Sequence, residues 1–138
     1  MTKAVILELH GDDNSGDVVR YTVANGTAIS KGTLCKIGAA NLTASAATGS
    51  GEPFAGIAST DKEANDGATT LGFYTNGVFD IVTAASSGIG IGNMVVMSGA
   101  DAVRVAVAND FISGAIVGKV LEVGTASTAV RVKVGGNY

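Results

Sequence analysis

The sequence contains few charged and few aromatic residues. Charged side chains make up 15% of the 138 residues, against roughly 25% in a typical soluble domain, and aromatic side chains make up 5%, with no tryptophan. So small a charged fraction leaves apolar surface that a partner can cover. We therefore favour a protein that assembles with other chains. The alternative is a monomer whose weakly polar surface, rich in glycine and alanine, is covered by serine and threonine.

Groups that carry chemistry are also scarce, with one cysteine, Cys35, and one histidine, His10. A single cysteine forms no internal disulfide, and zinc sites need three or four ligands. Cys35 lies in a strand-like run, where we expect a half-buried, inert thiol, and His10 lies in a turn, where we expect a solvated side chain. No serine has an activating base and no two carboxylates stand out as a pair. The sequence therefore predicts no enzymatic activity, no metal and no cofactor.

The distribution of charge and of apolar residues excludes further classes of protein. The net charge is −3, and the nine Lys and Arg residues are scattered without a basic stripe, so we expect no direct contact with nucleic acid. Residues 4–7 form an apolar run too short for a signal peptide, and no run is long enough to span a membrane. We expect a soluble protein that stays in the compartment where it is made.

Two short motifs imitate ligand sites. Residues 12–17 (DDNSGD) resemble a calcium loop, but the EF-hand register puts Asp17 where a glycine is required and supplies no glutamate at the twelfth place. We interpret them as an Asx-rich turn, with incidental calcium binding as the alternative. Gly88, Gly90 and Gly92 resemble a dinucleotide fingerprint, but the third glycine of that motif is absent and a strand is predicted to follow. We expect no nucleotide site.

The most informative feature that is present is a repeat. Residues 22–37 are echoed by residues 82–97, with Ile29 and Gly32 matched by Ile89 and Gly92. Each copy reads as a strand, a turn with an inserted isoleucine, a glycine corner and a second strand. Two copies are too few for a solenoid. The repeat predicts two related halves that share one core.

The rest of the chain consists of short strand-like runs between turn signals. Counting those at the ends of the repeats, we predict strands at residues 3–9, 18–23, 33–37, 41–46, 54–58, 69–75, 78–83, 103–107, 114–123 and 129–134. Asn76 and Gly77 lie between two such runs and predict a hairpin with a type I′ turn. Thr60 and Glu63 have the spacing of a capping box and predict one short helix that ends by residues 66–67.

These elements predict an all-β fold: a small β-sandwich or barrel with at most one short helix, two related halves and an N-terminal arm. Residues 1–17 form the arm and the acidic turn, and residues 18–138 form a single β domain. Because turn formers separate residues 3–9 from the rest, this apolar segment is either an edge strand or an arm that leaves the body.

An ordered set of short pieces resembles the tailed-phage capsid cement, or decoration, proteins. The pieces are residues 23–34, with Asn25-Gly26 and Ile29-Ser30-Lys31-Gly32, then residues 51–58 (GEPFAGIA), 76–81 (NGVFDI), 91–95 (IGNMV) and 117–122 (VGKVLE). The similarity runs from about residue 21 to residue 134, in order and with compatible spacing. Each piece is simple in composition, so the order carries the resemblance. The acidic turn at residues 12–17 has no place in that pattern.

The resemblance implies a structural virion protein that assembles, usually as trimers, on the outer surface of the phage head after synthesis in the host cytoplasm. There it bridges subunits of the major capsid protein and stabilises the shell, with no catalytic residues. Related proteins often hold the capsid through an N-terminal arm. By position alone, that arm corresponds here to Thr2, Lys3, Ala4, Val5, Ile6, Leu7, Glu8 and Leu9. The alternative is a module on the capsid surface that binds glycans or the host surface, which would require clustered, exposed aromatic side chains.

Overall fold

The computed structural model describes residues 3–9, 18–84 and 88–135. These residues form short strands and one short helix, so the predicted all-β class is confirmed. A first unit consists of β2 (Val18–Thr22), β3 (Leu34–Ile37), β4 (Ala44–Ala46), β5 (Phe54–Ala58) and β6 (Thr70–Tyr74). A second unit consists of β7 (Gly77–Thr83), β8 (Met94–Met97), β9 (Ala102–Val105), the helix α1 (Ala108–Ile112), β10 (Ile116–Val120) and β11 (Ala129–Val134). Strand β1 (Val5–Glu8) precedes both.

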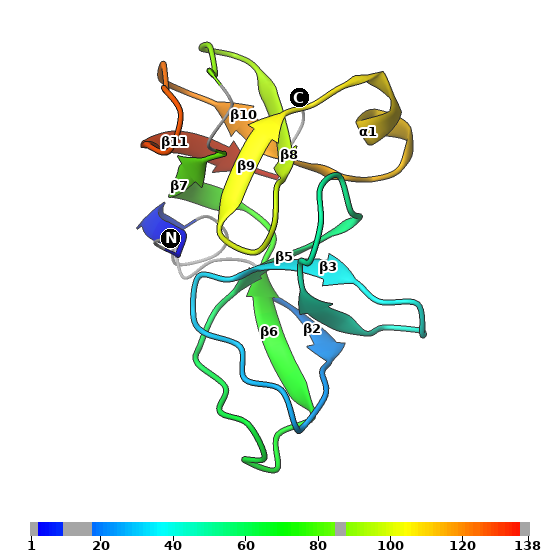
Figure 1. Cartoon of the computed structure of the whole chain (residues 1–138). Coiled ribbons are helices and arrows are strands. Elements are labelled where there is room, and N and C mark those ends of the chain that lie inside the picture. The colour runs from blue at the N-terminus through cyan, green and yellow to red at the C-terminus, as the bar shows by residue number, and fades with distance from the viewer. Residues whose placement is uncertain (1–2, 10–17, 85–87, 136–138) are drawn as a thin grey trace.

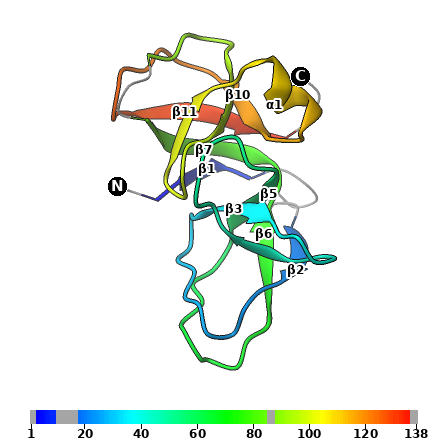
Figure 2. The ribbon, with the colours of Figure 1, turned by 45° about the vertical axis from the view of Figure 1, so that its right-hand side comes forward.

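The two units have the same strand order. The first sheet runs β2-β6-β5-β3-β4, and the second runs β7-β11-β10-β8-β9, with β1 added on the outer edge of β7. Strand β2 therefore corresponds to β7, β3 to β8, β4 to β9, β5 to β10 and β6 to β11. The units lie one above the other, with the second unit uppermost (Figures 1 and 2). The two related halves that the repeat predicts are confirmed.

The correspondence extends to irregular details of the sheets. In each unit one strand skips a residue just before a glycine, so that Gly56 faces Cys35 and Gly118 faces Val95. In the second unit a parallel pairing of β7 with β9 closes the five strands into a barrel. A single parallel bridge, between Thr22 and Thr43, lies in the equivalent place of the first unit.

The hydrophobic core is divided, whereas the repeat had predicted one core shared by the halves. One cluster of buried side chains fills the first unit around Phe73. The other fills the second unit around Phe79 and takes in Leu34, Ala47 and Ile57 from the first unit. Each unit therefore has its own buried cluster, and the junction between the units is continuous with the cluster of the second unit only.

The predicted hairpin at Asn76 and Gly77 is wrong. Strand β6 pairs with β2 and β5, whereas β7 pairs with β1, β11 and β9, so the chain passes from one sheet to the other at this point. Gly77 has a φ of 129°, and a Cβ atom here would lie 2.6 Å from the carbonyl oxygen of Glu8. The glycine therefore admits the close approach of β1 and does not serve a tight turn.

The predicted helix at residues 60–66 is also wrong. The backbone of Lys62 exchanges two hydrogen bonds with Ile29, at 2.9 and 2.7 Å, and the Asp61 carboxylate accepts the backbone N–H of Lys31 at 2.7 Å. These long-range bonds hold the segment extended. The one helix among the described residues is α1, at a place where no helix was predicted. It begins after Val107, whose N–H is accepted by the Asp110 carboxylate at 2.8 Å.

Candidate binding cleft at strand β1

The N-terminal segment lies in the fold as an edge strand, which is the first of the two alternatives for it. The structure describes the segment from Lys3 to Leu9, and Thr2 lies outside the described residues. Val5 pairs with Asp80 and Ile6 with Phe79 on the antiparallel strand β7. The side chains that point inward pack against the core of the second unit, and those that point outward are exposed. The inward set is Ala4, Ile6 and Leu9, and the outward set is Val5, Leu7 and Glu8.

Among the described residues, no strand pairs with β1 on the side away from β7. The N–H of Ala4 donates to the carbonyl oxygen of Gly32, in the first unit, at 3.1 Å. Because backbone groups alternate in direction along a strand, the N–H and C=O of Ile6 point the same way as those of Ala4. An ion pair between Lys3 and Asp101 holds the beginning of the segment to the second unit.

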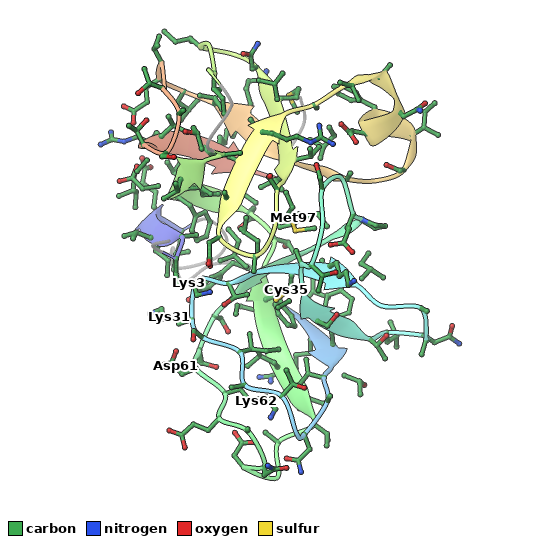
Figure 3. All side chains as sticks on the ribbon, in the orientation of Figure 1. Lys3, Lys31, Cys35, Asp61, Lys62 and Met97 are labelled. Carbon is green, nitrogen blue, oxygen red and sulfur yellow. The ribbon has the colours of Figure 1, made fainter. Side chains whose placement is uncertain are left out.

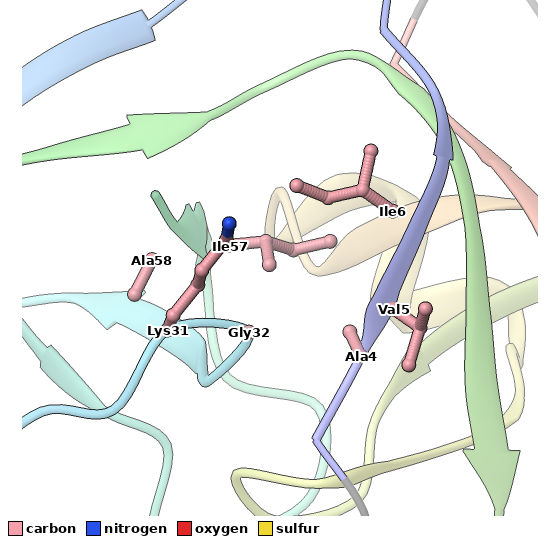
Figure 4. Close-up of a pocket in the computed structure, with 7 residues that line it drawn as sticks. All are labelled: Ala4, Val5, Ile6, Lys31, Gly32, Ile57 and Ala58. Carbon is pink, nitrogen blue, oxygen red and sulfur yellow. The ribbon is translucent and has the colours of Figure 1, made fainter. Parts of the chain in front are cut away.

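An apolar cleft of about 320 Å³ opens along this free edge. β1 forms one wall, and the Gly32 corner and the end of β5 form the other (Figure 4). Its lining residues are Ala4, Val5, Ile6, Lys31, Gly32, Ile57 and Ala58. Lys31 is the one charged residue among them, and it is exposed. The cleft therefore offers an apolar floor, a strand edge and a cation.

The Gly32 corner is shaped for the approach of β1. Gly32 has a φ of +86°, and a Cβ atom there would lie 2.4 Å from the carbonyl oxygen of Ala4. Gly92, its counterpart in the second unit, has a φ of +84° but no atom within 4 Å of such a Cβ. The turn requires glycine in both units, and only the Gly32 corner is covered by β1. The repeat marks this corner in the sequence, but no local pattern places Lys31, Gly32, Ile57 or Ala58 beside the arm.

Two carboxylates near the junction between the units, Asp110 and Glu52, accept hydrogen bonds from cations and from backbone N–H groups. Burial acts to raise the pKa of Asp110, but hydrogen bonds from the backbone N–H of Val107 and from Arg104 outweigh it, and the pKa lies below its ordinary value. A hydrogen bond from Lys36, at 2.7 Å, lowers the pKa of Glu52 to about 2, with help from the N–H groups of Gly49 and Thr48. Both carboxylates fasten loops around the junction.

The other side chains that the sequence singled out are separate from the cleft. Cys35 is fully buried in the core of the first unit, deeper than the expected half-burial (Figure 3), and burial raises the pKa of its thiol to about 12. His10 and residues 12–17 lie outside the described residues. Strand β8 follows the glycines at 88, 90 and 92, as predicted. Within residues 3–9, 18–84 and 88–135, no group of three His, Cys, Asp or Glu side chains is placed to hold a metal ion.

The aromatic side chains of the described residues face inward for the most part. Tyr21 packs edge-on against Phe73, with ring centroids 5.6 Å apart, and Tyr74 packs against Phe79 at 6.0 Å. Phe111, on α1, is the exposed one. The cluster of exposed aromatics that a glycan-binding module would need is therefore not found in this part of the chain.

No protein-family model matches the chain, and no curated protein matches it. No helix among the described residues is long and apolar enough to cross a membrane.

Proposed function

We propose that this protein is a capsid decoration protein, which binds the outer surface of a phage head and stabilises the shell by bridging subunits of the major capsid protein. The observation that carries the proposal is the cleft at β1, where an apolar N-terminal strand presents a free backbone edge. An extended segment of the capsid protein is the occupant. It adds to β1 as a new strand and covers Val5 and Leu7, which are 49% and 38% exposed.

The placement of β1 changes the expected mode of attachment. An arm that left the body would uncover Phe79, which is fully buried, and would remove Ile6 and Leu9 from the core. Adding a strand to β1 in place keeps these contacts and pairs the open edge. The arm residues thus act as a docking edge, and the capsid supplies the moving strand.

A trimer strengthens this attachment. Three equivalent clefts on one closed assembly engage three capsid segments together, so weak single contacts give tight overall binding. A ligand that binds only the mature shell also stabilises it, by roughly 2.7 kcal/mol per site when its concentration is a hundred times its dissociation constant. Light scattering of the purified protein is expected to give a trimer at high concentration, and trimeric density is expected on heads.

The test uses phage heads assembled from the capsid protein of the same genome without this chain. Added wild-type protein is expected to coat the heads, as counted by electron microscopy, and to raise the temperature at which they burst. Val5→Lys, which puts a charge on the docking edge while leaving the core untouched, is expected to lower the occupancy at least tenfold. Val123→Lys is the matched control, because Val123 is exposed but lies away from the cleft.

The outcomes separate the function from the site. Heads that never bind the wild-type protein contradict the decoration role. Heads that bind Val5→Lys as fully as wild type, while the role holds, move the contact to another face of the β body.

A further inference from the structure

The correspondence between the units reveals an edge that is filled in one unit and open in the other. Residues Val78 and Asp80 of β7 pair with β1. Their counterparts on β2 are Val18 and Arg20, and β2 is the edge strand of its sheet, with no described strand along this stretch. Thr22, at the end of β2, meets Thr43 just as Val82, at the end of β7, meets Ala102. The open stretch of β2 is therefore the vacant equivalent of the β1 position.

Exposure of the side chains agrees with a missing strand. Val78 is 6% exposed and Phe79 is fully buried on β7, where β1 covers them. Their counterparts on β2, Val18 and Val19, are each 43% exposed. Val18 and Val19 point to opposite faces of the sheet, so each face of this edge carries one exposed valine. An edge strand of this kind readily pairs with another chain.

The backbone of β2 points its free groups outward at this stretch. The N–H of Thr22 donates to the carbonyl oxygen of Leu42 at 2.7 Å, on the side away from β6. By alternation the N–H and C=O groups of Arg20 and Val18 point to the same side. Among the described residues no strand pairs with these groups, so a strand laid along β2 would meet them in the geometry that β1 uses on β7.

Charge indicates which kind of strand fits this edge. In the register of β1 on β7, Glu8 faces Val78 and so lies diagonally across from Asp80, a pairing of like charges. On β2 the position of Asp80 is occupied by Arg20, which forms no ion pair with any described residue. The same register on β2 would place an acidic side chain diagonally across from the guanidinium group of Arg20.

We propose that the open edge of β2 is a second strand-accepting site, and that its occupant is an extended segment of a partner protein with apolar residues at alternate positions and a carboxylate diagonal to Arg20. Its residues on β2 are separate from the seven residues that line the β1 cleft. It does not depend on the capsid role, so its failure would leave that role untouched.

The probe is a capped peptide of residues 2–9 (TKAVILEL), because this sequence is the one that fits the equivalent edge of β7. It is added to the full-length, isotope-labelled protein, and binding is followed by the shifts of backbone amide signals. The expected result is saturable shifts centred on Val18, Arg20 and Thr22. Arg20→Pro removes the outward N–H and no bond to β6, since edge strands tolerate proline there, and is expected to weaken binding more than tenfold.

Charge variants keep the test independent of any effect of proline on folding. Arg20→Glu is expected to weaken peptide binding about fivefold, and a peptide with Glu8→Lys is expected to bind this variant better than it binds wild type. Arg131→Glu is the matched control, because Arg131 is also an exposed arginine on a strand, and it is expected to change nothing.

Three results would overturn the proposal. These are no saturable shifts at millimolar peptide, shifts that centre on Val78 and Asp80 because the peptide has replaced β1, and equal affinity for wild type and Arg20→Glu.

Discussion

Ile29 and Ile89 occupy the same place in the two units. Each is buried, and each exchanges a pair of backbone hydrogen bonds with a residue beyond the fourth strand of its own unit. Ile29 bonds with Lys62 at 2.9 and 2.7 Å, and Ile89 bonds with Gly124 at 3.0 and 2.9 Å. The inserted isoleucine of the repeat therefore holds the loop before it against the segment that follows the fourth strand of its unit, through two backbone hydrogen bonds.

The two units differ in the residue that faces this isoleucine. Lys62 is 4% exposed, and its ammonium group donates to the carbonyl oxygens of Asn25 at 2.8 Å, Thr27 at 3.3 Å and Glu63 at 3.0 Å (Figure 3). At Gly124 a Cβ atom would lie 2.1 Å from the side chain of Val130. The first unit therefore holds a buried lysine side chain at this position, whereas in the second unit the side chain of Val130 takes up the space.

We expect Lys62→Met to lower the free energy of unfolding by about 2–3 kcal/mol, because it removes the donor to three partly buried carbonyl oxygens and the ion-pair partner of Asp66. Urea unfolding followed by circular dichroism measures the change. Lys31→Met is the control, since Lys31 is exposed, and its effect is expected within about 0.5 kcal/mol. Equal effects of the two substitutions would show that the ammonium group of Lys62 has no structural role.

Local patterns predicted the strands but not all of their partners. Alternating valines in β11 and the β-branched run in β7 determine strand formation within a few residues, so these elements could be identified from the sequence. The repeat likewise predicted two related units. The prediction of a hairpin at Asn76-Gly77 was wrong because Gly77 admits a contact with β1, which lies far earlier in the chain. Such a contact leaves no local signal.

The cleft at β1 also depends on contacts between distant residues, which local sequence patterns do not predict. The N-terminal segment was recognisable as an apolar strand cut off by turn formers, and Gly32 was recognisable as a repeated corner. Their meeting depends on the packing of one unit against the other, which brings Ala4 to Gly32. The prediction of a helix at residues 60–66 was wrong for a related reason. Lys62 forms hydrogen bonds with the backbone of Ile29 and with carbonyl oxygens of the distant loop at residues 25–27.

We expect Ile6→Ala to destabilise the protein by about 1–2 kcal/mol, because Ile6 packs against the core of the second unit. Val5→Ala on the same strand is expected to cost less than about 0.5 kcal/mol, since Val5 is half exposed. Urea unfolding of both variants gives the comparison. A loss of stability confined to Val5→Ala, or absent from both, would indicate that the segment leaves β7 in solution.

Acid is expected to lower the free energy of unfolding partly through the protonation of Glu52. Its pKa is lowered from an ordinary value near 4.5 to about 2, so the folded state holds the charged form more tightly than the unfolded state does. The stabilisation is present above pH 4.5 and is lost as the pH falls toward 2. Glu52→Gln lacks this contribution, so its unfolding midpoint in urea is expected to fall less than that of wild type between pH 6 and pH 2.5. Parallel decreases in the two proteins would assign the acid sensitivity to other carboxylates.

Gly118 is expected to tolerate no side chain. It follows the bulge in β10, and a Cβ atom there would lie 2.2 Å from the carbonyl oxygen of Lys133 on the paired strand, where the backbone has no room to yield. Gly118→Ala should therefore cost about 2 kcal/mol or more, by forcing β10 and β11 apart. Gly26→Ala is the control, because a Cβ atom there would meet only the Asn65 side chain, at an ordinary 3.6 Å. Thermal unfolding of the two variants measures the difference.

Since Gly56 occupies the same bulge in the first unit, where a Cβ atom would lie 2.7 Å from that of Phe73, Gly56→Ala should repeat the loss. A neutral result at both glycines would mean that the shared bulge is not what fixes strand spacing in the two units.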